Sequence, residues 1–174
     1  MDEHEFIQLL HNDGTWAAFE QDWREQCNAL DEDIDNYASP TFAVISPLAQ
    51  GNEPKAGLFA LRMNGRHVAV CQINTAAIPK YDAPVLRVRY MTLSPEFDLT
   101  EKTPSEYGDM LVSLLFQVLK IAAFDTNLGS NHIKFHLRSP TDQSFFSAIG
   151  RGLDEARVFD TVQTRGAWLY ITRK

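Results

Sequence analysis

A long amphipathic helix pattern stands between two strand patterns, and this order restricts the fold more than any other feature of the chain. From Ser105 to Asn127 apolar residues recur every three or four positions, as on the buried face of a helix. Val85 to Leu93 before it and Ile133 to Leu137 after it are typical of strands, because apolar and β-branched residues dominate these short runs. A helix that connects two strands of one sheet makes a right-handed crossover. The sequence therefore predicts that both strands lie in one sheet, with Val85 to Leu93 as a central strand.

The N-terminal part has two helix patterns. The first is short, from Glu5 to His11, and the second begins after Asp13, which suits a helix start. The second pattern carries a stripe of large apolar residues, which we expect to pack onto the sheet or its helices while the acids of the same segment lie in water. The stripe consists of Trp16, Phe19, Trp23, Cys27 and Leu30. A polar run from Asp31 to Ser39, followed by Pro40, is expected to end this helix.

From Thr41 onward the pattern changes to alternation with a period of two, which indicates strands. The predicted strands before Val85 are Thr41 to Ser46, Gly57 to Met63 and Arg66 to Asn74. Asn64-Gly65 separates the last two and predicts a tight hairpin, because both central residues of such a turn need positive φ. Pro47 to Pro54 and Ala77 to Pro84 are expected to be loops.

In the C-terminal half, the polar segment Pro95 to Pro104 leads into the long helix, for which we expect Ser105 as the N-cap and Gly129 as the end. The elements predicted after Leu137 are a short helix, Thr141 to Ile149, and a strand pair, Val158 to Arg165 and Ala167 to Thr172. The fold class is α+β, with a central mixed, mostly antiparallel sheet flanked by helices and two helices at the N-terminus. We expect one domain over residues 1–174, made of a helical segment 1–40 and a sheet-and-helix part 41–174.

The charge is distributed unevenly along the chain. The formal net charge is −7, but residues 1–40 hold eleven acids against the single base Arg24, so the remainder carries +3. Such an acidic segment should repel nucleic acid and anionic lipid, which are bound chiefly through clustered Lys and Arg. It is either a solvated face or a docking surface for a protein partner. The acidic start and the absence of a run of ~18 apolar residues predict neither a secretory signal nor a membrane span, and hence a cytoplasmic protein.

The sequence predicts no metal site. His132 and His136 are four residues apart, but the segment reads as a strand, in which four residues span ~13 Å, too far to share one zinc ion. Cys27 and Cys71 fit no metal or redox motif and are expected to be buried free thiols. The chain also lacks a nucleophile elbow, a Walker A loop and a dinucleotide-binding glycine motif.

Arg87 and Arg89 alternate with apolar residues and so extend from the same face of their strand. Two uses are open: they bind an anion, or they pair with the acidic N-terminal helices.

The order from Gly57 onward resembles the fold of the GNAT superfamily, the acyl-CoA-dependent N-acetyltransferases. Two local stretches carry the resemblance near the expected cofactor, namely Leu93-Ser94-Pro95 at a strand end and the helix opening Tyr107-Gly108-Asp109-Met110-Leu111. A third, Ser139 to Gly150, is similar to a family stretch that begins with asparagine and contains a tyrosine. Ser139 replaces that asparagine, and Phe146 replaces the tyrosine that often protonates the departing thiolate. Thr103 and Glu106 stand where the family's phosphate loop has a basic or amide residue and a glycine.

The resemblance implies a soluble, bacterial-type acyltransferase that passes an acyl group from acetyl-CoA or another acyl-CoA to a small-molecule or peptide amine. It also implies that Val85 to Leu93 diverges from Ile133 to Leu137, which opens a cleft near the start of the Ser105 helix. The residues expected to bind the acyl-CoA are Met91, Leu93, Tyr107, Gly108, Asp109, Ser139 and Phe146. His136 and Glu96 are the candidates for a base that acts through water. The alternative is a non-catalytic module with this fold, which binds a protein partner through its acidic helices or a remodelled cleft.

Overall fold

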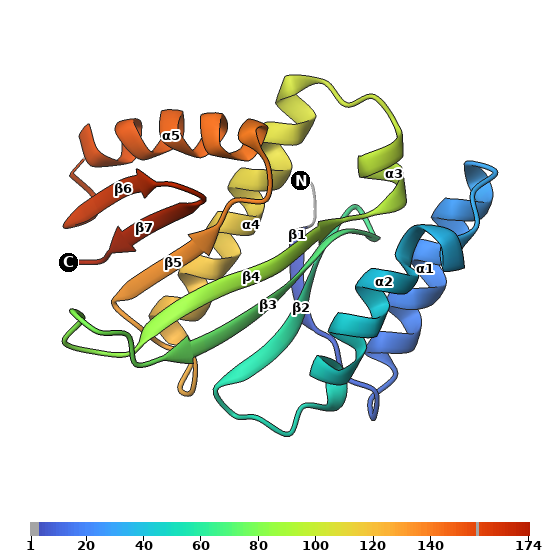
Figure 1. Ribbon diagram of the computed structural model, residues 1–174, viewed down its shortest axis with the longest axis horizontal. Coiled ribbons are helices and arrows are strands. Elements are labelled where there is room, and N and C mark those ends of the chain that lie inside the picture. The colour runs from blue at the N-terminus through green and yellow to red at the C-terminus, as the bar shows by residue number, and fades with distance from the viewer. Residues whose placement is uncertain (1–3, 156) are drawn as a thin grey trace.

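The computed structural model describes residues 4–155 and 157–174, which form a seven-stranded sheet and the helices that pack on it (Figure 1). The sheet has the strand order β1-β2-β3-β4-β5-β7-β6. β4 and β5 are parallel, and every other neighbouring pair is antiparallel. The elements in chain order are β1 (His4–Gln8), α1 (Thr15–Ala29), α2 (Ile34–Ile45), the 3₁₀ helix η1 (Ser46–Gln50), β2 (Ala56–Met63), β3 (Arg66–Ala76), β4 (Val85–Leu93), α3 (Pro95–Leu99), α4 (Pro104–Phe124), β5 (His132–His136), α5 (Pro140–Glu155), β6 (Thr161–Arg165) and β7 (Trp168–Thr172). The mixed, mostly antiparallel α+β class is therefore confirmed.

The predicted helix Glu5 to His11 is wrong, because this segment forms the edge strand β1. β1 pairs antiparallel with β2, with Phe6 opposite Leu61, and the Phe6 ring stacks on Phe59 at 5.3 Å. A short apolar run is compatible with either a helix or a strand, and here pairing with the edge of β2 makes it a strand. Of the acids in the predicted acidic segment, Asp2 and Glu3 lie outside the described residues.

The structure also corrects the segment from Asp31 to Gln50. The run expected to end the first helix holds the start of α2, where the Asp33 side chain accepts a hydrogen bond from the Asp35 N–H at 2.9 Å. Pro40 lies inside this helix, and the predicted strand Thr41 to Ser46 is its second half. Burial of Ile34, Ala38 and Ile45 on one side explains why packing overrides the proline and the β-branched residues. The predicted loop from Pro47 begins as η1.

The hairpin and the central strand are as predicted. Asn64 and Gly65 have φ values of 52° and 80°, as the tight turn between β2 and β3 requires. β4 has the predicted bounds and lies between β3 and β5. The predicted C-terminal strand pair is present as β6 and β7, and α5 is longer than the predicted helix.

The start and end of α4 differ from the prediction. Thr103, rather than Ser105, is the N-cap, and it forms a capping box with Glu106, in which each side chain bonds the backbone N–H of the other residue. The helix ends at Phe124, five residues before Gly129. The preceding segment, expected to be a turn, contains the short helix α3.

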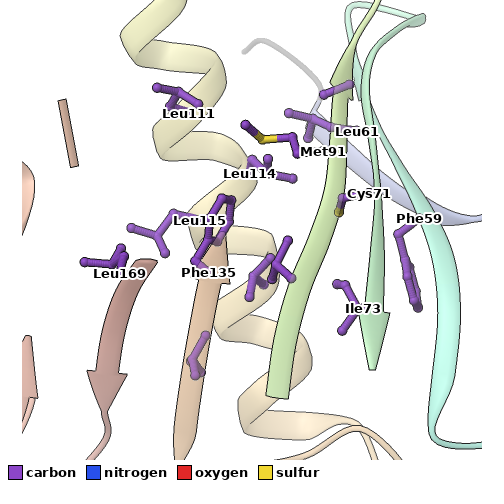
Figure 2. Close-up of a cluster of buried hydrophobic side chains, with 14 of the residues drawn as sticks. Phe59, Leu61, Cys71, Ile73, Met91, Leu111, Leu114, Leu115, Phe135 and Leu169 are labelled. Atoms are coloured by element: carbon purple, nitrogen blue, oxygen red, sulfur yellow. The ribbon is translucent and has the colours of Figure 1, made fainter. Parts of the chain in front are cut away.

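Helices cover the two faces of the sheet unequally (Figure 1). α4 and α5 pack on one face and form the larger core. Figure 2 shows Leu111, Leu114 and Leu115 of α4 directed toward the sheet, where Phe135, Met91 and Cys71 lie. By length and composition α4 is the one described helix that could cross a membrane, but its apolar side is buried against the sheet, as in the core helix of a soluble protein.

α1 and α2 cover the opposite face, where they pack on β2 and β3. The predicted stripe of α1 packs there: Trp16, Phe19, Trp23 and Cys27 are buried. The expectation that the acids of α1 lie in water is wrong for Asp22. Its Oδ2 accepts hydrogen bonds from the backbone N–H of His67 at 2.7 Å and lies 2.8 Å from the ring Nδ1. Arg66 lies 3.0 Å from its other oxygen, so Asp22 ties α1 to the hairpin.

Asp22→Asn should therefore destabilise the protein by about 1 to 3 kcal/mol, because it removes the charged acceptor from buried donors. Burial alone would raise the pKa of Asp22, but the hydrogen bonds from His67 and the charge of Arg66 hold it below the usual 3.8. The stabilisation is thus complete above the unfolded pKa and is lost as the pH falls through the lower folded pKa. Urea unfolding of both proteins near neutral pH and at about pH 3 measures this, and the difference between them should shrink in acid.

Glu20→Gln, which removes an exposed pair with Arg24, is the matched control and should change stability little. An Asp22→Asn effect as small as that of the control would contradict the assigned role.

Candidate active-site cleft

The cleft predicted from the strand order is present where β4 and β5 separate. Their parallel pairing runs from Val85 opposite His132 to Val88 opposite Phe135, and β4 then continues to Leu93 beside β3 alone. In this stretch β4 has two residues, Tyr90 and Met91, opposite one residue of β3, which is a β-bulge. Tyr90 has φ 51° and is exposed. A β-bulge bends its strand and leaves one residue outside the regular ladder, and this one lies in the stretch where β4 no longer pairs with β5.

A cavity of about 520 Å³ lies at this end of the two strands. Its walls come from the end of β4, α3, the loop before α4, and the first turns of α4 and α5. The walls combine apolar and aromatic side chains with two cations. The residues are Leu93, Phe97, Asp98, Thr100, Lys102, Pro104, Tyr107, Arg138, Ser139, Thr141 and Phe145.

Arg138 is the centre of a hydrogen-bonded chain along one wall. Its guanidinium lies 3.4 Å from Asp98 and 3.8 Å from Asp142. Asp98 also accepts a hydrogen bond from the Tyr37 hydroxyl at 3.4 Å, and Asp142 accepts one from the Tyr107 hydroxyl at 2.5 Å. The chain holds the guanidinium at the cavity with part of its charge offset by the two carboxylates.

Asp142 links three elements at the cleft although it is fully buried. Besides the Tyr107 hydroxyl of α4, it accepts the backbone N–H of Arg138 at 3.1 Å, while its own N–H donates to the Ser139 hydroxyl. Burial, and then the hydrogen bond to Asp142, raises the pKa of Tyr107 to about 12, so its phenol stays protonated at neutral pH. The sequence analysis missed Asp142 and Arg138, although Ser139-Pro140-Thr141-Asp142 has the spacing of a capping box with proline at the first helical position.

The structure brings only some of the predicted acyl-CoA residues to the cleft. Leu93, Tyr107 and Ser139 line the cavity. Met91 and Phe146 are buried in the core, where Phe146 packs on Phe135 at 5.2 Å. Asp109 is exposed on the first turns of α4.

Gly108 has a packing role that the sequence analysis did not foresee. A Cβ at this position would lie 3.0 Å from the Phe145 ring, so the glycine lets α5 approach α4. The N–H groups of Gly108 and Asp109 lie inside the helix, where such groups bond to carbonyls one turn earlier. Tyr107 likewise donates to Thr103 O at 3.1 Å, Glu106 donates to the Thr103 hydroxyl, and Pro104 has no N–H. The first turn therefore offers the backbone N–H of Ser105. This group lies two residues before the start of the predicted segment Tyr107 to Asp109.

Neither predicted base lies among the described residues that line the cavity. Glu96 is exposed on α3 at the rim, where its carboxylate is 3.7 Å from the Lys102 ammonium. His136 is the last residue of β5 and extends from the opposite face of the sheet, with its ring 4.7 Å from Trp168. Because β5 separates from β4 at this residue, His136 stands beside the opening between the strands.

Two further expectations concern metals and arginines. In residues 4–155 and 157–174 no group of three metal-ligating side chains is found, and His132 is paired with Asp82 instead. Arg87 and Arg89 take part in none of the ion pairs formed by the described residues, so their predicted pairing with the acidic helices is wrong. The reason is geometric, since α1 and α2 pack over β2 and β3, and α2 contacts β4 at the last residue of that strand, where the Tyr37 hydroxyl donates to Leu93 O at 3.0 Å, six positions from Arg87.

Solved structures of acetyltransferases resemble this fold. A probable acetyltransferase from Staphylococcus epidermidis matches with a TM-score of 0.53 and 10% identity, over 97% of this chain and 96% of that chain. An N-acetyltransferase from Staphylococcus aureus matches with a TM-score of 0.49 and 12% identity, over 99% and 97% of the two chains. A KacTA–DNA complex matches with a TM-score of 0.47 and 13% identity, over 79% of this chain and 80% of that chain. No protein-family model and no curated protein matches the sequence.

Asp142 should be essential for the architecture of the cleft. We expect Asp142→Asn to cost about 2 to 3 kcal/mol, because an amide offers one acceptor oxygen where a carboxylate offers two and its NH₂ group would face a donor. Tyr107→Phe removes one hydrogen bond and should cost about 1 kcal/mol. Thermal unfolding of the two variants and of the double variant measures both costs. Additive effects would contradict a direct Tyr107–Asp142 interaction.

Proposed function

Because this chain has the fold of the GNAT acetyltransferases, strongly diverged in sequence, we propose that it transfers an acyl group from an acyl-CoA to an amine. The observation that carries the proposal is the 520 Å³ cavity at the point where the parallel strands β4 and β5 separate. Ligands of open sheets with parallel strands bind at the carboxyl ends of the strands, and this cavity has that position.

The residues around the cavity fit the parts of an acyl-CoA. Past Val88 the edge of β4 that faced β5 has no strand partner, so its backbone groups can bond an extended amide-containing chain as a further strand would. Leu93, Phe97 and Phe145 supply apolar wall. Lys102 and Arg138 supply the positive charge that phosphates require, with the Ser105 N–H at the start of α4. Phosphate binding would thus depend more on these two side chains than on a glycine loop.

The reaction needs few groups from the protein. The lone pair of the amine nitrogen attacks the thioester carbonyl carbon, the C–S bond breaks, and the sulfur leaves as the thiolate of CoA. The nitrogen loses one proton, and the thiolate gains one, so that amide and thiol are formed. His136, beside the strand opening, is the candidate acceptor of the amine proton. Phe146 cannot donate a proton, and the Tyr107 hydroxyl is engaged by Asp142, so water would protonate the thiolate.

A second candidate, a module that binds without catalysis, is favoured by one observation: no described carboxylate or histidine other than Asp98 lines the cavity, and Asp98 is engaged by Arg138. Transfer of acetyl from labelled acetyl-CoA to an amine panel separates the two. Binding of acetyl-CoA without transfer to any amine would leave the binding module.

The cations of the cleft give the next prediction. In calorimetric titration with CoA, Lys102→Gln and Arg138→Gln should each weaken binding about tenfold, because each removes a charge-assisted contact to phosphate. Lys120→Gln, which changes an exposed lysine farther along α4, should leave the affinity unchanged. CoA at ~100 times its Kd should stabilise the wild-type protein by ~2.7 kcal/mol. No heat and no stabilisation by CoA or acetyl-CoA would overturn the proposed function.

The acids at the start of α4 give an effect of opposite sign. Glu106→Gln with Asp109→Asn should tighten CoA binding at low salt and less so at high salt, because two exposed negative charges near the phosphates are removed. Glutamine can still accept the Thr103 N–H, so the capping box is kept. Thr103→Val, which removes the capping hydroxyl and keeps both negative charges, is the control for loss of the box alone. CoA titrations at two salt concentrations test this. Equal affinities of the wild type and the double variant would mean that the phosphates bind elsewhere.

A further inference from the structure

The half of the sheet formed by β4, β5, β7 and β6 has one face that no helix of residues 4–155 and 157–174 covers (Figure 1). α4 and α5 pack on the other face of these strands, and α1 and α2 lie over β2 and β3. We call this the open face. It holds the side chains that alternate with the core residues of each strand, such as Arg87 between Leu86 and Val88.

Two rows of side chains cross the open face. In the first row, strand pairing places Asn74, Arg87, Lys134, Tyr170 and Gln163 next to one another on five adjacent strands. Neighbours in such a row are ~5 Å apart, so Arg87 and Lys134 are adjacent like charges.

The second row lies two residues farther along the strands. It consists of Gln72 and Arg89 on β3 and β4, and of His136, Trp168 and Arg165 on β5, β7 and β6. The gap in this row between Arg89 and His136 is the opening between β4 and β5 described above.

The bases of the open face lack counter-ions in the part of the chain that the structure describes. Arg87, Arg89, Lys134 and Arg165 belong to none of its ion pairs, although the protein has an excess of acids. Three of them lie over aromatic rings instead. The Lys134 ammonium is 4.2 Å from the Trp168 ring centre, and the Arg165 and Arg89 guanidiniums are each 4.9 Å from the rings of Tyr170 and Tyr90. Adjacent like charges cost stability unless an anion offsets them.

A cavity of about 380 Å³ lies on the open face beneath the loop between β3 and β4. Lys80, Lys134 and Arg165 line it together with Tyr81 and Tyr170, and no described Asp or Glu is among its lining residues. The neighbouring carboxylate of Asp82 is engaged by His132 Nε2 at 2.6 Å.

Unpartnered polar atoms mark the same face. Gln72 Oε1 and Asn74 Oδ1 on the adjoining strand β3, and Arg87 Nε on β4, are shielded from solvent and have no hydrogen-bond partner among the described residues. Buried polar groups are normally satisfied, so these three atoms, which the two rows place together, are available to a ligand.

We propose that the open face binds the acyl acceptor and selects an amine that also carries a carboxylate. The carboxylate lies some 7 Å from the amine nitrogen, which is the distance between the two rows of side chains. The proposal rests on the proposed acyl transfer. With the amine beside His136 at the strand opening, the anion lies among Arg87 and Lys134 of the first row and Arg165, which lines the adjoining cavity. The amino terminus of a short peptide whose third residue is acidic has this reach. The acidic α1 and α2 beside this face disfavour a long polyanion.

Two matched peptides test the proposal by direct binding. The probes are the amides of Ala-Ala-Glu and Ala-Ala-Gln, which differ only in one charge. The indole N–H signals in NMR spectra report the site, because Trp168 lies on the open face whereas the other two, Trp16 and Trp23, are buried under α2. We expect the Trp168 signal alone to shift, with about tenfold tighter binding of the glutamate peptide. Equal affinities, or no Trp168 shift with either peptide, would overturn the inference.

Variants then assign the charge preference. Arg87→Gln and Lys134→Gln should each reduce the preference for the glutamate peptide to about threefold or less and should leave CoA affinity unchanged. Lys120→Gln on α4 is the control cation and should keep the preference. Arg87→Gln should also unfold at the same or a higher temperature than wild type, since it relieves repulsion with Lys134, so loss of binding would not reflect loss of the fold.

Three other outcomes are decided by the same samples. CoA binding and acyl transfer without charge preference would leave the proposed function intact and sink only the acceptor assignment. Failure of CoA to bind would overturn the proposed function. A single-stranded oligonucleotide that shifts the Trp168 signal and displaces the glutamate peptide would replace the peptide by nucleic acid as the occupant of the open face.

Discussion

The parallel pairing of β4 with β5 is the constraint on which the rest of this structure depends. Parallel neighbours cannot be joined by a tight turn, so the chain must cross the sheet, and α4 makes this crossing and supplies much of the larger core. The pairing stops at Val88 and Phe135 while β4 continues along β3. The cleft, with the starts of α4 and α5 beside it, is therefore a consequence of how two strands part.

The same two strands present different chemistry on either side. On the helix-covered side, Arg138 and Lys102 stand at the rim of a largely apolar cleft, as a ligand with a charged and an apolar part requires. On the other side, Arg87 and Lys134 stand side by side without carboxylate partners among the described residues, because the acidic helices α1 and α2 pack over β2 and β3. Although the net charge is −7, four bases of the open face thus lie near this strand opening outside all ion pairs of the described residues. In the proposed function the acyl donor and the acceptor meet there.

Two hydrogen-bonded carboxylates, one partly and one fully buried, show how stability and site are connected. Asp22 fastens α1 to the hairpin, and Asp142 fastens the start of α5 to α4 and to the end of β5. Because Asp142 holds Tyr107 and the backbone of Arg138, it sets the shape of the cleft wall without being a group that meets a substrate. Its partner Tyr107 is 35 positions away in the sequence, so only the packing of the helices brings the two together.

Local patterns determined much of the fold, and long-range contacts decided the rest. The Asn64-Gly65 hairpin, the β4 strand, the α1 stripe and the long helix follow from turn chemistry and hydrophobic period, which need no knowledge of distant residues. Of the expected site, the strand separation and three cavity residues were predictable. β1 was mistaken for a helix and the half of α2 after Pro40 for a strand, because such short runs take the state that their neighbours stabilise. The open face was invisible in the sequence, since whether Arg87 meets an acid depends on where α1 and α2 end over the sheet, and only tertiary packing decides that.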